Sequence, residues 1–148
     1  LWIWEQPDYT RSYLVVADVA RGDGKDYSAC HVIDVESATQ VAEYRGQVGT
    51  REYGHMLVGL AAEYNDALLS IENANVGWDT VQTAIDRAYR NLYYSTKQEA
   101  LTSEQWTRRM DSSGDNLVPG FTTSTKDLIA SSMIFTAALY FPTLILLT

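Results

Sequence analysis

Apolar segments of strand length come first in the chain and are separated by short polar turns. Residues 13–19 form a near-continuous, β-branched apolar run, which is typical of a buried strand. Residues 27–35 alternate between apolar and polar positions, and residues 41–46 follow after the polar turn "ESATQ". Because only short connections separate these three predicted strands, we expect them to pair as an antiparallel meander.

Two segments with helical spacing of apolar positions follow. The first lies between Thr50, a suitable N-cap, and Asn65, which we expect to end the helix. Residues 77–89 repeat the same spacing and predict a second helix. A short apolar strand is predicted after each helix, over residues 67–73 and 91–95.

The predicted order is therefore three strands, a helix, a strand, a helix and a strand. Strands that follow helices are expected to pair parallel to the first strand, through right-handed crossovers. This order predicts an α/β fold of the ribonuclease H-like type. It has a mixed sheet of three antiparallel strands, then parallel strands reached by helix crossovers, with helices on both faces.

A single domain over residues 1–148 accounts for the pattern, since this length suffices for one sizeable core. Residues 96–120 are polar, with "DSSGDN" predicted as a loop, and a third helix is predicted from Lys126. From about residue 130 the sequence is atypical, with no charged residue between Leu128 and Thr148. This stretch is too short and interrupted for a membrane span, so we interpret it as a core element or as the altered end of an incomplete domain.

Charge and cysteine content narrow the possible functions. The chain has 19 acidic and 11 basic residues, for a formal net charge of −8, which argues against a surface that wraps nucleic acid. An acidic, metal-loaded site that cuts nucleic acid is still compatible, because bound cations reverse the local charge. The single cysteine, Cys30, excludes an internal disulfide and is predicted to be a buried thiol in a reducing, intracellular setting.

Two carboxylates end strands that otherwise have a core pattern: Asp18 ends the first strand and Glu72 the fourth. If these strands are parallel neighbours, both acids lie at the edge where open α/β sheets bind ligands. Two close carboxylates repel each other unless they share a proton or a metal ion. Oxygen ligands favour Mg²⁺ or Mn²⁺, and two such ions about 4 Å apart support phosphodiester cleavage.

The sequence around both acids resembles a known family. The segments "LVVADVARGDGKDYSACHVID", "EYNDALLSIENANVG" and "PGFTTSTKDLI" resemble, in this order, the nuclease domain of tailed-phage terminase large subunits. The resemblance covers roughly residues 1–129. It implies a metal-dependent endonuclease with two Mg²⁺ or Mn²⁺ ions, which cuts concatemeric double-stranded DNA during genome packaging in the host cell cytoplasm.

The resemblance also implies roles for individual residues. Asp18 and Glu72 would be the catalytic metal ligands, and Asp26 would give lesser support to the metal site. Substrate contacts are implied for the segment after the second acid, where amides and a helix N-terminus would meet a phosphate: Asn73, Asn75 and Gly77. The implied partners are double-stranded DNA, the portal protein and the small terminase subunit, with oligomerisation on the portal and no membrane. The family's ATPase domain would precede Leu1.

Two other interpretations stay open. The family's third essential acid has no counterpart here, since Asp127 lies upstream of its place, and this favours a catalytically incomplete docking module. Another ribonuclease H-like nuclease, such as a junction resolvase, would differ in substrate preference. Lys25 is placed to approach a phosphate, whereas His31 and His55 are predicted to serve packing or the surface, and Trp78 to pack in the core.

Overall fold

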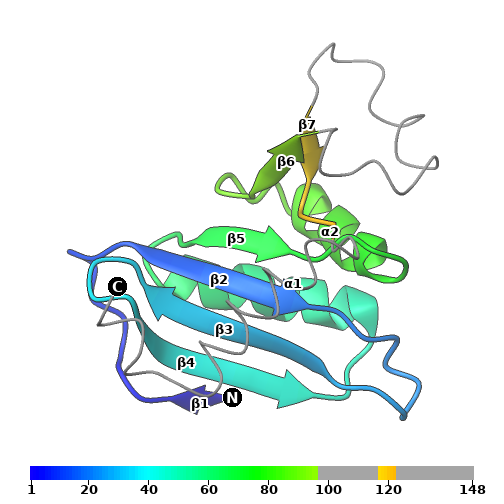
Figure 1. Ribbon diagram of the computed structural model, residues 1–148, viewed down its shortest axis with the longest axis horizontal. Helices are drawn as coiled ribbons and strands as arrows, with labels where there is room; N and C mark the ends of the chain where they lie inside the picture. Colours follow the sequence, from blue (N-terminus) through cyan, green and yellow to red (C-terminus); the bar gives the residue numbers. More distant parts are fainter. Residues whose placement is uncertain (97–116, 123–148) are drawn as a thin grey trace.

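The elements over residues 13–96 follow the predicted order, and two further short strands, one before and one after them, were not predicted (Figure 1). The computed structural model describes residues 1–96 and 117–122. The strands and helices are β1 (Trp2–Ile3), β2 (Tyr13–Asp18), β3 (Ser28–Asp34), β4 (Thr39–Gly46), α1 (Thr50–Glu63), β5 (Leu68–Ile71), α2 (Gly77–Asp86), β6 (Tyr94–Thr96) and β7 (Leu117–Pro119).

A five-stranded mixed sheet forms the centre of the molecule, with the strand order β1-β4-β3-β2-β5. The pairs β2–β3 and β3–β4 are antiparallel, as the short turns predicted, and β1 adds antiparallel to β4. Strand β5 pairs parallel with β2, after the crossover through α1. In Figure 1 the arrowheads of β2, β4 and β5 all point to the same edge of the sheet. The predicted α/β, ribonuclease H-like mixed sheet is confirmed.

The outer edge of β5 differs from the prediction. Leu92 forms a parallel bridge with Leu69 on β5, but β6 then pairs antiparallel with β7 in a separate two-stranded sheet. The prediction of one parallel strand over 91–95 is therefore wrong beyond Leu92, and strand β7 over 117–119 was not predicted. Phe121 continues along β5 instead, through a parallel bridge with Glu72. These segments are far apart in sequence, so no local pattern of residues indicates that they pair.

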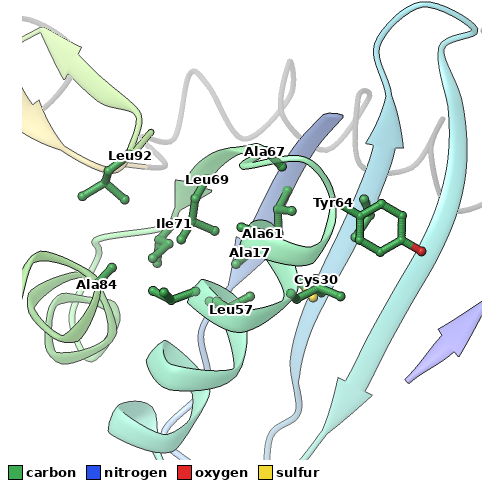
Figure 2. Close-up of a cluster of buried hydrophobic side chains, with 14 of the residues drawn as sticks. Ala17, Cys30, Leu57, Ala61, Tyr64, Ala67, Leu69, Ile71, Ala84 and Leu92 are labelled. Atoms are coloured by element: carbon green, nitrogen blue, oxygen red, sulfur yellow. The ribbon is translucent and has the colours of Figure 1, made fainter. Parts of the chain in front are cut away.

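The main core lies between the sheet and α1. Side chains of β2 and β3, including Ala17 and Cys30, point toward Leu57 and Ala61 of the helix (Figure 2). The predicted burial of Cys30 is confirmed, since its relative exposure is 0%. Burial raises the pKa of its thiol to about 12, so this cysteine has no reactive role at neutral pH.

The two helices pack against each other. In Figure 1, α1 lies behind the sheet and α2 lies beyond its β5 side. Gly54 makes this close packing possible, because a Cβ there would lie 2.7 Å from Cβ of Thr83 on α2. The N-cap of α1 is Gly49, not Thr50 as predicted. The hydroxyl of Thr50 instead donates a 2.5 Å hydrogen bond to Asp79 and so joins the beginnings of α1 and α2.

The third helix, predicted from Lys126, falls outside the described residues. No helix in the described part of the chain is long and apolar enough to cross a membrane.

Candidate active site

Asp18 and Glu72 lie at the same end of two adjacent, parallel strands. Ala17 pairs with Ile71, and the backbone amide of Glu72 donates a 2.9 Å hydrogen bond to the carbonyl oxygen of Ala17. The register therefore places the two acids next to each other, about 5 Å apart at the Cα atoms. The two side chains project to the same face of the sheet, opposite α1. The strand register agrees with the prediction that the two acids lie side by side at the carboxyl ends of parallel strands.

The row that contains both acids continues across the sheet. Asp18 pairs with Ala29 on β3, and Ala29 pairs with Arg45 on β4. Because paired residues share a face, Glu72, Asp18, Ala29 and Arg45 follow one another across four strands on one surface. The row begins with two carboxylates, passes a small residue and ends with a guanidinium group.

An open pocket of about 660 Å³ lies over this row. Asp18 and Ala29 line it from the sheet, and Asp26 and Tyr27 line it from the loop between β2 and β3. Lys25 and Arg45 are the basic lining residues. The pocket thus brings together Asp18 and Asp26, the first and the supporting acid of the sequence prediction, while Glu72 lies one strand further along.

The loop from 19 to 27 packs closely at Gly22. Gly22 has a φ of +72°, and a Cβ there would lie 2.5 Å from the carbonyl oxygen of Val48. The loop therefore packs directly on the connection between β4 and α1. Asp26 and Tyr27 at its end are exposed, and the Tyr27 ring lies 4.6 Å from the guanidinium carbon of Arg45. This stacking fixes one wall of the pocket.

The segment after Glu72 turns sharply into α2. Asn75 is exposed and has a φ of +51°, a left-handed conformation that asparagine tolerates better than most residues. Gly77 begins the helix, and the backbone of Glu72 lies directly against it. The N-terminus of α2 thus lies beside the second acid, and no side chain caps it. The amides of Gly77 and Asp79 donate hydrogen bonds to the carbonyl oxygens of Ala74 and Val76. The positive end of the helix dipole faces this turn, and the phosphate contact predicted here stays a prediction.

Asn73 has a different position from Asn75. Its side chain is 0% exposed, and its amide nitrogen donates a 2.8 Å hydrogen bond to the carbonyl oxygen of Pro119. Its amide oxygen accepts a 2.5 Å hydrogen bond from the hydroxyl of Thr122. These contacts anchor segment 117–122 against the end of β5. The substrate contact predicted for Asn73 stays a prediction, but the observed contacts are structural.

The side chains beneath the acids are apolar or neutral. Tyr53 in the first turn of α1 is fully buried. Burial, followed by the proximity of Cys30 and Asp18, raises its pKa well above the usual value of 10. The phenol therefore stays protonated at neutral pH. Trp78 packs in the core as predicted, at 9% exposure.

The histidines lie away from the acids. His31 is buried on the sheet, and its Nδ1 lies 3.8 Å from a carboxylate oxygen of Glu43. Burial lowers the pKa of His31, so the ring is mainly neutral. His55 is exposed on α1 and contacts Arg87. These positions agree with the packing and surface roles predicted for both residues.

The chemistry of the donors at this edge suits a hard divalent cation. Asp18 and Glu72 supply carboxylate oxygens from adjacent strand ends, and Asp26 supplies another at the same pocket. Among residues 1–96 and 117–122, no group of three or more histidine, cysteine, aspartate or glutamate residues is arranged to hold a metal ion. Asp127, which the sequence prediction left without a role, lies outside those residues.

Arg45, Tyr27 and Ala29 are the site residues that sequence reasoning missed. Their link to Asp18 depends on strand register, although the alternation in "AEYRG" could have placed Arg45 on the exposed face of its strand.

Comparison with solved structures identifies the fold. The large terminase nuclease from thermophilic phage G20c with bound magnesium matches with a TM-score of 0.54 and 19% identity, over 93% of this chain and 57% of that one. The same nuclease with bound cobalt matches with a TM-score of 0.54 and 17% identity, over 93% of this chain and 57% of that one. With bound zinc it matches with a TM-score of 0.51 and 21% identity, over 60% of this chain and 50% of that one.

No protein-family model and no curated protein matches the sequence. The chain spans about half the length of the solved structures it matches. At these identities the similarity concerns the fold, and the strand order and crossover agree with it. The chain therefore has the ribonuclease H-like fold of the large terminase nuclease domains.

Proposed function

We propose that this chain is the metal-dependent endonuclease domain of a viral DNA-packaging terminase. The observation that carries the proposal is the juxtaposition of Asp18 and Glu72 at the ends of parallel neighbouring strands. An open pocket with basic side chains lies over the first acid, as expected for a site that receives a phosphodiester. The shared fold with terminase nucleases solved with magnesium, cobalt or zinc supports the metal dependence.

Each acid has a distinct part in this proposal. Asp18 and Glu72 would hold Mg²⁺ or Mn²⁺ as catalytic ligands, in the two-metal arrangement that the resemblance implies. Asp26, across the pocket from Asp18, would bind the metal as a lesser ligand or accept hydrogen bonds from its water shell. Such a cation lowers the pKa of bound water and neutralises charge on a phosphate. Tyr53 stays neutral beneath the site, so it supplies no base.

The N-terminus of α2 is proposed to orient the substrate. Asn75 and Gly77 place this end of the helix beside Glu72, where its positive dipole would face a phosphate oxygen of the bound strand. Asn73 would contribute by fixing the turn, through its hydrogen bonds to segment 117–122.

Double-stranded DNA is the proposed substrate, cut during packaging with little sequence preference. The portal protein, the small terminase subunit and an oligomer on the portal are proposed partners, and the host cytoplasm is the proposed location. The fold match to large terminase nucleases supports these proposals.

Nicking of supercoiled plasmid in Mn²⁺ tests the catalytic proposal. We expect the chain to nick the plasmid, and Asp18→Asn, Glu72→Gln or EDTA to abolish nicking. Glu63→Gln is the matched control, because this exposed residue ends α1 at the other edge of the sheet. Mn²⁺ binding measured by calorimetry on the same variants gives a readout that is independent of cleavage.

The competing interpretations predict different results. A docking module would show weak Mn²⁺ binding and no nicking by the unaltered chain, and that result would overturn the catalytic proposal. A resolvase-like nuclease would prefer branched DNA to linear duplex when both are offered together. Equal or faster cutting of plain duplex would support the terminase proposal over this second alternative.

A further inference from the structure

Arg45 is the basic residue most closely tied to the candidate metal ligands. The row Asp18–Ala29–Arg45 places its Cα two strand spacings, about 10 Å, from that of Asp18. Its side chain is on the same face as the acids and lines the same pocket. A guanidinium group at this distance would reach a phosphate next to one that is held at the acids.

The guanidinium group of Arg45 is available for such a contact. The ion pairs of the described residues involve Arg11 and His31, and Arg45 takes part in none of them. The ring of Tyr27 supports it at 4.6 Å and limits its rotamers. A stacked guanidinium keeps its donor edge free, so the geometry favours binding of an anion with two oxygens, such as a phosphodiester.

Ala29 leaves space between the acids and the arginine. It separates Asp18 from Arg45 in the row and forms the floor of the pocket. Lys25 lines the same pocket from the loop that also carries Tyr27. A nucleic-acid strand that enters over Ala29 would thus pass between a carboxylate side and a cationic side. On a chain with a net charge of −8, this local cationic side is needed to bring a polyanion to the acids.

We propose that Arg45, stacked on Tyr27, binds the DNA backbone at the phosphate next to the one cut, and that Lys25 assists it. This proposal rests on the proposed nuclease function for the identity of the ligand. It assigns the direction in which the strand crosses the sheet, from Glu72 past Asp18 and Ala29 toward β4.

Salt-dependent DNA binding tests the proposal without cleavage. The measurement is fluorescence anisotropy of a labelled DNA duplex in EDTA, over a series of salt concentrations. Each phosphate contact contributes about 0.9 to the slope of log K against log salt concentration. We expect Arg45→Gln to flatten the slope by about 0.9. Arg45→Lys should keep the slope but weaken affinity, because lysine lacks the planar donor edge.

Arg90→Gln is the matched control for net charge. Arg90 is exposed and precedes Asn91, which pairs with the beginning of β5 at the opposite edge of the sheet. We expect its slope to equal that of the unaltered chain. Tyr27→Leu should weaken binding because it removes the stacking support, whereas Tyr27→Phe keeps the ring and should bind normally. Thermal unfolding of each variant confirms that the fold is intact.

Three outcomes would overturn this assignment. The salt slope could be unchanged in Arg45→Gln, Arg90→Gln could flatten the slope as much as Arg45→Gln does, or the unaltered chain could fail to bind the duplex. These outcomes are distinct from failure of the nuclease proposal. If the chain nicks plasmid but binds DNA independently of Arg45, the nuclease proposal stands and the Arg45 contact is wrong. If DNA binding depends on Arg45 but the chain never nicks, the Arg45 contact stands and the catalytic proposal is wrong.

Discussion

Gly77 lies against the backbone of Glu72, so closely that a Cβ on Gly77 would be 1.9 Å from the carbonyl oxygen of Glu72. No side chain fits there unless the end of β5 or the start of α2 moves. Because Glu72 is one of the candidate metal ligands, this contact couples the position of the acid to the position of the helix.

Gly77→Ala should therefore disturb both stability and metal binding. We expect a loss of about 2 kcal/mol in the free energy of unfolding, as for overpacked sites, and weaker Mn²⁺ binding in calorimetry. Asn75→Gly is the control in the same turn, because it relieves a φ of +51° without closing any contact. Full stability and metal affinity in Gly77→Ala would show that the turn adapts freely.

Two glycines of α1 allow a matched test of helix packing. A Cβ on Gly54 would meet Thr83 of α2 at 2.7 Å, whereas a Cβ on Gly59 meets nothing within 4 Å. We expect Gly59→Ala to stabilise the chain by about 0.5–1 kcal/mol through helix propensity, and Gly54→Ala to destabilise it. Denaturant unfolding of both variants measures the difference. Equal stabilisation by both would mean that the helices are less closely packed than described.

Repulsion between the adjacent acids should be measurable without metal. Asp18→Asn removes one of two neighbouring negative charges, so in EDTA we expect a rise of about 2 °C in Tm. With Mn²⁺ present the order should reverse, because only the unaltered chain gains stability from binding. Glu63→Gln should change neither value. An Asp18→Asn variant that is stabilised by Mn²⁺ as much as the unaltered chain would exclude Asp18 as a ligand.

Asp34 should give stability that depends on pH. Burial alone would raise the pKa of this carboxyl, but the hydrogen bond from Arg11 and the backbone amide of Ser37 outweigh burial, so its pKa lies below the usual 3.8. The stabilisation is therefore complete above the unfolded-state pKa of about 3.9 and is lost as the pH falls through the lower, folded-state pKa.

Asp34→Asn should accordingly be less stable than the unaltered chain at pH 7, and the difference should shrink on acidification below about pH 4. Thermal unfolding across this range measures it, with Glu63→Gln as a control that keeps the original pH dependence. A difference that stays constant with pH would assign the effect to packing and not to the charge of Asp34.

Asn73 should contribute to stability by anchoring segment 117–122 through its hydrogen bonds. Asn73→Asp replaces the amide that donates to the carbonyl of Pro119 with an oxygen and places a charge at a fully buried position. We expect a loss of about 2 kcal/mol or more, and faster hydrogen exchange at the amides of Gly120 and Phe121. Exchange rates equal to those of the unaltered chain would show that segment 117–122 is held by other contacts.

Much of the fold follows from local pattern. The near-continuous apolar run before Asp18 and the short turns after it predicted a buried strand within an antiparallel meander. Helical spacing predicted both α1 and α2, although α2 ends at Asp86, three residues before the predicted end. These features depend on neighbours in sequence, so the sequence determines them. An acid at the end of an apolar run, as at Asp18 and Glu72, is likewise visible in the sequence because its burial would be costly.

Only the tertiary structure decided which residues are neighbours on adjacent strands. The register that aligns Asp18 with Ala29 and Arg45, and the parallel pairing that brings Glu72 beside Asp18, are fixed by packing of the whole sheet on α1. Segment 117–122 reaches the end of β5 through Asn73 for the same reason. Such contacts depend on side chains distant in sequence, and a one-residue shift in register would turn every side chain of a strand to the other face.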